Sequence, residues 1–145
     1  MTNKQLIEKQ FVEIFNKGNL AYAEEVCSPT LMLHDVTFQQ ATLGPEAVKQ
    51  FAHMYREAFP DLNVVIEEIL EQDNKVAVLW KATGTHQKPL FGIAPTKKFY
   101  TITGQSFYKV AKGYITEIFV QWDVIKLLRE MKVELPIKLE TEIPV

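Results

Sequence analysis

Histidines and carboxylates at three places in this sequence could transfer protons or hold a metal ion. His34 and Asp35 are adjacent, His86 ends an alternating apolar segment, and Asp123 directly precedes the apolar-periodic run 124–128. Two histidines and a carboxylate form a ligand set that binds iron or zinc. We expect no metal here, because adjacent residues do not easily converge on one ion and no spacing such as His-x-x-x-His occurs.

Asp123 has a structural interpretation as well as a chemical one. Aspartate is a preferred N-cap residue, since its side chain accepts hydrogen bonds from the first backbone N–H groups of a helix. The periodic run that follows Asp123 predicts such a helix. Capping and a chemical role are compatible, and the sequence leaves both open.

The adjacent pair His34 and Asp35 should point to opposite faces of a strand, because side chains alternate along it. Only one of the two would then face inward. The competing interpretation is a surface aspartate beside a hydrogen-bonded histidine; we favour it slightly for Asp35 and hold both interpretations equal for His34. His86 shares a strand face with Trp80, and it lies either at the mouth of a cavity or solvated at a strand end.

The composition is that of an ordinary globular domain. The 145 residues are 47% hydrophobic and 23% charged, and a chain of this length buries a core without disulfides or metals. A formal net charge of −2 argues against nucleic acid as a partner. We identify no signal peptide and no membrane span, and we interpret the single cysteine, Cys27, as a small core residue, so we expect a cytoplasmic protein.

Helical patterns dominate the first part of the chain. Residues 4–17 place their apolar side chains on one side of a helix, and Asn19 is placed to cap a shorter helix that reaches residue 27. A short strand is predicted over residues 31–36. A third helix follows over residues 45–59, opened by a glycine-proline pair and ended by a second proline.

The rest of the chain changes to the period of a sheet. Residues 123–132 then form a last helix, and residues 134–145 are a tail or a strap over a partner. Helices gathered first and strands gathered after predict a single α+β domain over residues 1–145, with a tapered cavity between a curved sheet and its helices. The predicted strands are 62–72, 75–86, 99–110 and 114–122.

Several local strings, with the order of the elements, resemble a known family over residues 6–133. They are His34-Asp35, Gly44-Pro45-Glu46-Ala47-Val48, Phe59-Pro60-Asp61-Leu62, Trp80-Lys81-Ala82-Thr83-Gly84-Thr85-His86, Gly92-Ile93-Ala94-Pro95-Thr96, Ile115-Thr116-Glu117, and Trp122-Asp123 leading to Leu127-Leu128. The chain is similar to the SnoaL-like polyketide cyclases of the nuclear-transport-factor-2-like superfamily. The resemblance implies a cone-shaped α+β barrel, a strongly curved antiparallel sheet with the N-terminal helices over its concave face.

The resemblance also implies an activity and a set of site residues. The characterised cyclases close a ring by intramolecular aldol condensation without metal or organic cofactor, and Asp123 matches the position of their catalytic acid/base. His34, with His86 or with Gln105 where some relatives carry a histidine, would donate hydrogen bonds to the developing oxyanion. The implied substrate-binding residues are Asp35, Tyr55, Trp80, His86, Gln105 and Phe119, although Phe119 is more simply a core residue.

Two functions therefore compete. The first is a cofactor-free enzyme that removes a proton next to the carbonyl of a hydrophobic small molecule. The second is a binding module of the same fold that holds a ligand or a partner without turnover. A dry pocket whose polar groups satisfy one another would favour binding, and a carboxylate free in the pocket would favour catalysis. Epoxide hydrolysis is a third, weaker reading, because it needs an arginine between two aspartates.

We also expect a homodimer formed through the outer face of the sheet. A sheet with helices on one face leaves its other face for a partner. The expected apolar positions on that outer face are Ile118 and Val120.

Overall fold

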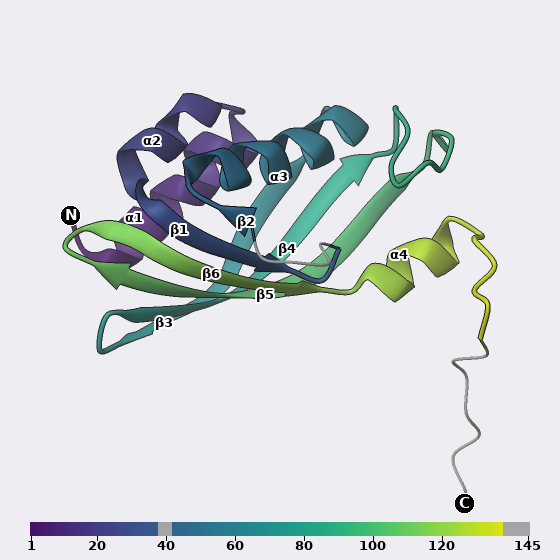
Figure 1. Cartoon of the computed structure of the whole chain (residues 1–145). Helices are drawn as coiled ribbons and strands as arrows, with labels where there is room; N and C mark the ends of the chain where they lie inside the picture. Colours follow the sequence, from purple (N-terminus) through teal and green to yellow (C-terminus); the bar gives the residue numbers. More distant parts are fainter. Residues whose placement is uncertain (38–41, 138–145) are drawn as a thin grey trace, which may run out of the picture.

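The computed structural model describes residues 1–37 and 42–137, in which helices lie against one face of a curved sheet (Figure 1). This arrangement confirms the predicted α+β class. The helical elements are α1 (Asn3–Gln10), the π-helix η1 (Phe11–Asn16), the 3₁₀-helix η2 (Leu20–Tyr22), α2 (Ala23–Val26), α3 (Pro45–Ala58) and α4 (Val124–Glu130). The strands are β1 (Cys27–Asp35), β2 (Thr42–Leu43), β3 (Asn63–Gln72), β4 (Lys75–Thr85), β5 (Phe99–Ala111) and β6 (Tyr114–Trp122).

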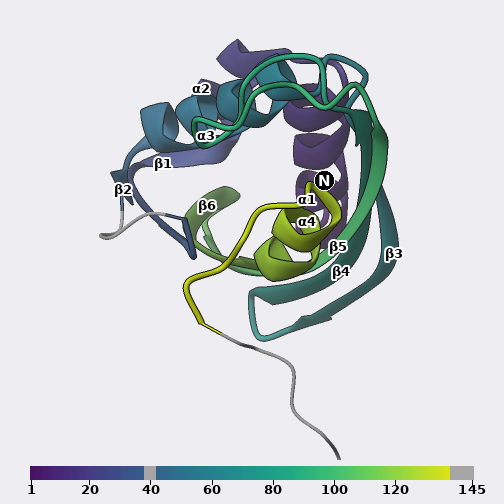
Figure 2. The same ribbon diagram turned by 90° about the vertical axis from the view of Figure 1, so that its right-hand side faces the viewer.

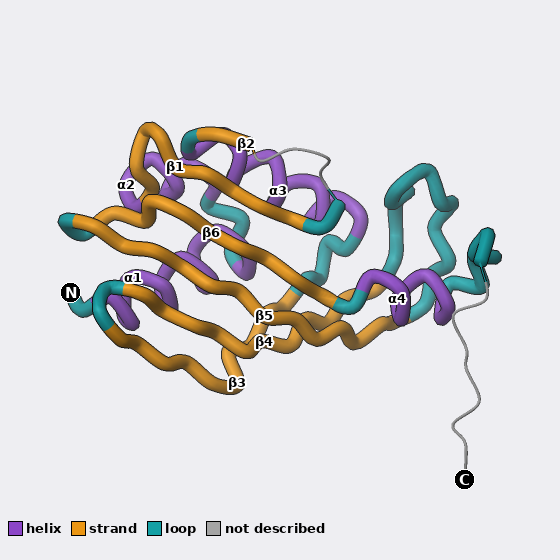
Figure 3. The backbone as a smooth tube through the Cα atoms, turned by 60° about the horizontal axis from the view of Figure 1, so that its bottom comes forward, coloured by secondary structure: helices purple, strands orange, loops and turns teal. Residues whose placement is uncertain are grey.

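The six strands form one sheet in the order β2-β1-β6-β5-β4-β3 (Figure 3). Neighbouring strands run antiparallel except β1 and β6, which run parallel. The sheet is therefore mixed, whereas the sequence and its family resemblance predict a wholly antiparallel one. It curls around the helices without closing into a barrel, since β2 and β3 stay at the two ends of the strand order (Figure 2).

The N-terminal helix begins at a capping box in which Thr2 and Gln5 exchange hydrogen bonds of 2.9 and 3.1 Å. Its predicted apolar face is buried against the sheet. The α-helix does not continue to residue 17, however, because η1 replaces it after Gln10. Gly18 ends the segment with a φ of 74°, a backbone conformation that glycine adopts without steric cost.

The end of η1 is fastened both to the edge of the sheet and to α3. The Asn16 side chain donates to the Val64 carbonyl at 2.9 Å and accepts from the Val64 N–H at 2.6 Å. An amide side chain thus occupies the position of a neighbouring strand along β3. Arg56 on α3 donates to the carbonyls of Phe15 and Asn16 at 2.6 and 3.0 Å, which satisfies acceptors that a helix end leaves open.

The segment between residues 19 and 35 differs from the prediction. The Asn19 side chain makes no capping hydrogen bond, and only η2 and one turn of α2 form here. Cys27 begins β1, ahead of the predicted start at residue 31. Pro29 is tolerated inside the strand because the pairing with β6 is interrupted between Cys27 and Met32.

The later elements lie close to their predicted ranges. β6 has the predicted bounds, and β3, β4 and β5 differ only at one end. Of the predicted tail, residues 134–137 form neither helix nor strand, and residues 138–145 lie outside the described residues, as do residues 38–41.

Trp80 of β4 packs across a glycine of β5. The alternating apolar face predicted for β4 points inward, and Trp80 is paired with Gly104 in the register of the two strands. A Cβ atom added to Gly104 would lie 2.2 Å from the indole ring. The missing side chain at Gly104 therefore provides the space in which the indole lies.

We predict that Gly104→Ala lowers the free energy of unfolding by about 1–3 kcal/mol, the usual cost of overpacking a filled core. Combining it with Trp80→Phe should recover part of that loss, because the smaller ring removes the clashing atoms. Urea unfolding of the two single variants and the double variant measures this coupling. Strictly additive losses would show that the Trp80 ring is not what Gly104 accommodates.

Candidate functional site

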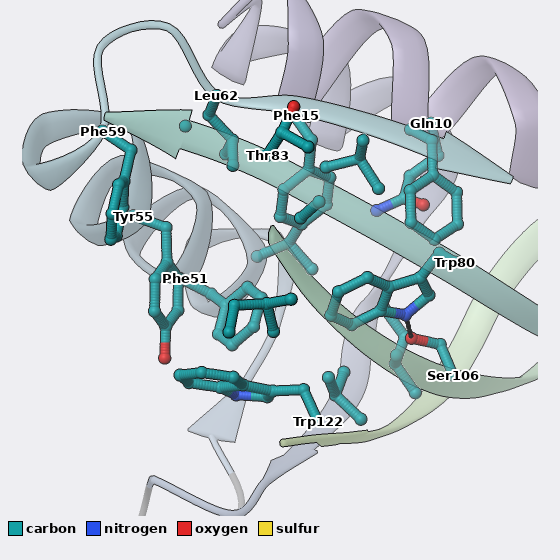
Figure 4. A pocket seen from close by; sticks show the side chains of 18 of the residues that line it. Gln10, Phe15, Phe51, Tyr55, Phe59, Leu62, Trp80, Thr83, Ser106 and Trp122 are labelled. Atoms are coloured by element: carbon teal, nitrogen blue, oxygen red, sulfur yellow. Dashed lines mark hydrogen bonds between the residues drawn. The ribbon is translucent and has the colours of Figure 1, made fainter. Parts of the chain in front are cut away.

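A cavity of about 100 Å³ lies between the concave face of the sheet and the helices (Figure 4). Helix α3 and the inward faces of β1, β4, β5 and β6 provide most of its wall. A pure hydrocarbon cavity of about 150 Å³ admits benzene, so this volume corresponds to roughly one small ring. Tyr55 and Trp80 are among the aromatic residues of the lining, which are Phe11, Phe15, Phe51, Tyr55, Phe59, Trp80, Tyr100, Tyr108 and Trp122.

One part of the cavity wall carries polar groups that bond to one another. Trp80 Nε1 donates to Ser106 Oγ at 2.9 Å (Figure 4), and the Tyr108 hydroxyl donates to Gln10 Oε1 at 3.2 Å. Burial raises the pKa of the Tyr108 hydroxyl, so it remains a neutral donor. These paired groups leave an essentially apolar surface for a ligand.

The opposite part of the wall, which we call the polar end, carries groups without such partners. The Tyr55 hydroxyl and Trp122 Nε1 are buried there, and neither makes a hydrogen bond of ordinary geometry to any residue that the structure describes. Their rings meet edge to face with centroids 5.5 Å apart. Because buried polar groups are nearly always hydrogen-bonded, this pair is a candidate contact for the polar group of a ligand.

Asp35 lies beside the polar end. It is only 7% exposed, so the prediction of a surface position for Asp35 is wrong. Its Oδ2 accepts from the Thr37 N–H at 2.9 Å and from the Thr37 hydroxyl, while Oδ1 is buried without a partner among the described residues. Burial raises the pKa of the Tyr55 hydroxyl; Thr37 opposes this increase, the Asp35 charge adds to it by a smaller amount, and Trp122 has the smallest, lowering effect.

The sequence contains a pattern that predicts the inward position of Asp35. Leu31 and Leu33 are both buried on β1, and Asp35 continues their alternation on the same face. An inward Asp35 follows from that pattern alone. The Thr37 contact gave no comparable signal, because it depends on how the chain turns after the strand.

His34 points to the other face of β1, as the alternation requires. Its Nε2 lies 2.7 Å from Glu117 Oε2, and its ring stacks on Phe119 with centroids 4.4 Å apart. The Glu117 carboxyl has a lowered pKa because of the hydrogen bond to His34 and the nearby Lys109. The structure therefore places His34 in a surface cluster, away from the cavity.

Two further predicted pocket residues also lie on the outer face of the sheet. Phe119 is 38% exposed and Gln105 is exposed, whereas the inward residues of β6 are Ile118 and Val120, which are 2% and 7% exposed and line the cavity. The expectation of Phe119 and Gln105 as pocket residues and of Ile118 and Val120 as outer-face residues is thus corrected. The register of β6 is opposite to the one assumed.

Asp123 caps α4, as one of its two interpretations predicts. Its Oδ1 accepts from the Lys126 N–H at 3.2 Å, and the residue is exposed. β6 ends at Trp122, whose side chain lines the cavity, and Asp123, the next residue, is not among the lining residues. The position that the resemblance assigns to the acid/base therefore holds a surface cap in this structure.

His86 lies neither at the mouth of the cavity nor in solvent. It is fully buried, with its ring against Phe59, and Nδ1 accepts from the Thr96 N–H at 3.1 Å. Accepting from a backbone donor fixes the neutral tautomer with the proton on Nε2. The Thr96 hydroxyl lies 2.8 Å from the hydroxyl of Tyr100, which links this buried histidine to a cavity-lining residue.

The loop that His86 anchors reaches over the polar end. Phe91 lies near the tip of this loop, with its ring centroid 6.3 Å from Tyr55 and 6.5 Å from Trp122. Its φ of 51° is unusual for a residue with a side chain, and the residue is 42% exposed. The Phe91 ring thus covers the end of the cavity where the unpaired polar atoms lie.

We predict that His86 makes stability depend on pH between about 7 and 5.5. Burial lowers the pKa of His86 in the folded protein below its usual value near 6.5. The unfolded chain then binds more protons in this range, so the free energy of unfolding should fall as pH falls through the unfolded pKa. Chemical unfolding at closely spaced pH values measures the slope.

His86→Asn should flatten that slope, because an asparagine oxygen can still accept from the Thr96 N–H without titrating. His53→Asn, at an exposed histidine of α3, is the matched control and should leave the slope unchanged. An equal slope in wild type and His86→Asn would rule out the assignment.

No cluster of three or more potential metal ligands occurs in residues 1–37 and 42–137. Cys27 is buried, and burial with the nearby Glu24 charge raises the pKa of its thiol to about 12, which agrees with its interpretation as a core residue. None of the described helices is long and apolar enough to cross a membrane.

Comparisons with known proteins match the fold and the family description. Residues 5–131 match the family model described as SnoaL-like polyketide cyclase. A candidate SnoaL-like polyketide cyclase from Jannaschia sp. CCS1 is 21% identical with a TM-score of 0.83, over 92% of this chain and 93% of the other. IdmH from Streptomyces antibioticus, also a candidate polyketide cyclase, is 23% identical with a TM-score of 0.78, over 92% and 100%. No protein of curated function matches the sequence.

Proposed function

The chain belongs to the SnoaL-like polyketide cyclase family, and on that premise we propose that it is a cofactor-free acid/base enzyme. Its substrate would be a hydrophobic small molecule with a carbonyl group, and its reaction a proton transfer next to that carbonyl followed by aldol-type ring closure. The observation that carries this proposal is the division of the cavity into an apolar part and a polar end with buried, unpaired groups.

The division of the cavity predicts how a substrate would lie. Its apolar body would contact the wall near Trp80 and Tyr108, whose polar atoms are already paired. Its carbonyl oxygen would lie at the polar end, where the Trp122 N–H and the Tyr55 hydroxyl lack partners among the described residues. Donors fixed before the reaction stabilise the negative oxygen of an enolate without reorganisation.

The volume of the cavity limits the size of that substrate. Pockets for drug-sized ligands measure about 300–1,000 Å³, whereas this cavity measures about 100 Å³. A molecule of about one ring fits the cavity as it stands. A larger one requires the ring of Phe91 to move away from the polar end.

A non-catalytic binding module of the same fold is the second candidate function. The observation that favours it is the pairing of Trp80 with Ser106 and of Tyr108 with Gln10, since mutually satisfied polar groups form an inert pocket wall. A binding module would hold the same small apolar ligands and release them unchanged.

We predict that small ketones such as cyclohexanone quench the fluorescence of the protein in a saturable manner, because Trp80 and Trp122 both line the cavity. Val120→Phe should abolish this binding by filling the cavity. Val65→Phe, at an exposed position of β3, makes the same substitution away from the cavity and should not affect binding. Absence of binding by every small ketone tested contradicts both functions.

Turnover separates the two candidate functions. A diketone such as 2,6-heptanedione forms a six-membered ring when its enolate carbon attacks the second carbonyl. The enzyme should increase the rate of this ring closure, measured by mass spectrometry, and Val120→Phe should remove the increase. Saturable binding with no increase above the solution rate would support the binding module instead.

We also propose that the outer face of the sheet forms a homodimer, through other residues than the sequence suggested. Phe107 and Phe119 are partly exposed there, and their ring centroids lie 6.3 Å apart. The charged pair of Lys109 and Glu117 lies next to them. Phe119→Glu should shift sedimentation at micromolar concentration from dimer to monomer. Tyr114→Glu, at the exposed hairpin end of the same strand, should not. A monomeric wild type would overturn this proposal.

The remaining expectations from the sequence stay predictions. They are a cytoplasmic location, inferred from the single cysteine, and the lack of a nucleic-acid partner, inferred from the net charge of −2.

A further inference from the structure

We propose that Gln10 is a substrate-recognition residue whose side-chain nitrogen donates a hydrogen bond to a second oxygen of the substrate. The site then selects neutral molecules that carry an acceptor oxygen at both ends of an apolar body. This inference rests on the proposed function, which places the reacting carbonyl at the polar end, and it adds a contact at the other part of the cavity.

Gln10 lies in the wall of the cavity, at the point where α1 ends and η1 begins. It lines the cavity and is only 1% exposed, so its amide is shielded from bulk solvent. The amide nitrogen is directed toward the space between Phe15 and Trp80 (Figure 4). Segments of π-helix within a helix are frequent at functional sites. The side chain is thus positioned to meet a ligand in the cavity.

The hydrogen bonds of the neighbouring wall run in one direction and end at Gln10. Trp80 Nε1 can only donate, and it donates to Ser106 Oγ at 2.9 Å. Burial raises the pKa of the Tyr108 hydroxyl, and a hydrogen bond with Ser106 lowers it by less. Tyr108 therefore keeps its proton and donates to Gln10 Oε1 at 3.2 Å. This last bond fixes which way the Gln10 amide is turned.

The Gln10 nitrogen is the donor that this chain of hydrogen bonds leaves over. The amide oxygen accepts from Tyr108, whereas the nitrogen has no hydrogen-bond partner within residues 1–37 and 42–137. Buried polar groups nearly always have partners, and two apolar side chains in place of Gln10 and Tyr108 would avoid the cost of an unpaired one. A bound acceptor atom accounts for the nitrogen, which the contact with Tyr108 alone does not.

The lining determines which kind of acceptor fits. The described residues of the lining include no lysine, arginine or histidine, so a carboxylate or phosphate in the cavity would lack a counter-charge. A neutral carbonyl oxygen has the lone pairs that an amide N–H requires without that cost. The cavity of about 100 Å³ holds about one ring, so the two oxygens lie on opposite sides of a body of that size. The substrate class is therefore that of small neutral dicarbonyl compounds.

Relative affinity for two ketones tests the assignment, by fluorescence titration of the full-length protein. 1,4-Cyclohexanedione carries carbonyl oxygens at both ends of one ring, and cyclohexanone carries one. The double variant Gln10→Met/Tyr108→Phe removes the donor without leaving the Tyr108 hydroxyl unpaired. It should reduce the preference for the dione over cyclohexanone by about three- to tenfold, the contribution of one neutral hydrogen bond, and leave the affinity for cyclohexanone unchanged.

Tyr108→Phe alone is the matched control, because it keeps the Gln10 amide, and it should retain the preference for the dione. An equal preference in wild type and the double variant, or loss of the preference in Tyr108→Phe alone, overturns the assignment. An equal loss of affinity for both ketones in the double variant also overturns it. In these three cases wild type still binds ketones and the proposed function stands. Absence of binding of either ketone to wild type refutes the proposed function itself.

NMR of the side-chain amides in wild type gives a measurement that does not depend on the folding of a variant. Binding of 1,4-cyclohexanedione should shift the Gln10 NH₂ proton resonances downfield, because a carbonyl acceptor deshields the proton donated to it. Cyclohexanone should shift them much less. Gln10 resonances that stay unchanged at saturating dione contradict the proposal.

Discussion

The parallel pairing of β1 with β6 is the constraint on which the site depends. It brings the first strand beside the last, although four strands lie between them in the sequence, and its register sets Asp35 opposite Val120 and His34 opposite Phe119. Because side chains alternate along a strand, a shift of one residue would exchange the two faces. The buried carboxylate and the exposed imidazole–aromatic stack are therefore two consequences of one register.

Polar groups on the two faces of the sheet differ in whether they have hydrogen-bond or ion-pair partners. On the outer face, His34 and Glu117 contact each other, and Lys109 joins the carboxylate. Inside the cavity, paired and unpaired groups lie at different ends. Leaving a buried donor unpaired costs about 1–3 kcal/mol, so unpaired groups persist where a bound molecule can offset the cost. The stability of the fold is therefore lowered at the same place where binding of a ligand would restore it.

Much of the fold followed from the sequence, and much of the site did not. Alternation and turn residues predicted the bounds of β3 to β6, and the family resemblance predicted the curled sheet. The inward position of Asp35 was also readable from Leu31 and Leu33, but the resemblance drew attention to Asp123 instead. Nothing local could have predicted that η1 interrupts the first helix or that β1 pairs with β6, since both depend on contacts distant in sequence.

The amide of Asn16 and the guanidinium of Arg56 have a mechanical consequence for the cavity. Together they tie η1 and α3 to each other and to the edge strand β3, so the helical roof and that side of the sheet are joined by short hydrogen bonds. Expansion of the cavity on this side would break several bonds at once. The opposite side is bounded by the loop of Phe91, whose ring centroid lies 6.3 Å from that of Tyr55 and 6.5 Å from that of Trp122. We therefore expect the wall of the cavity to be rigid on the side of Asn16 and Arg56 and to yield more readily on the side of the Phe91 loop.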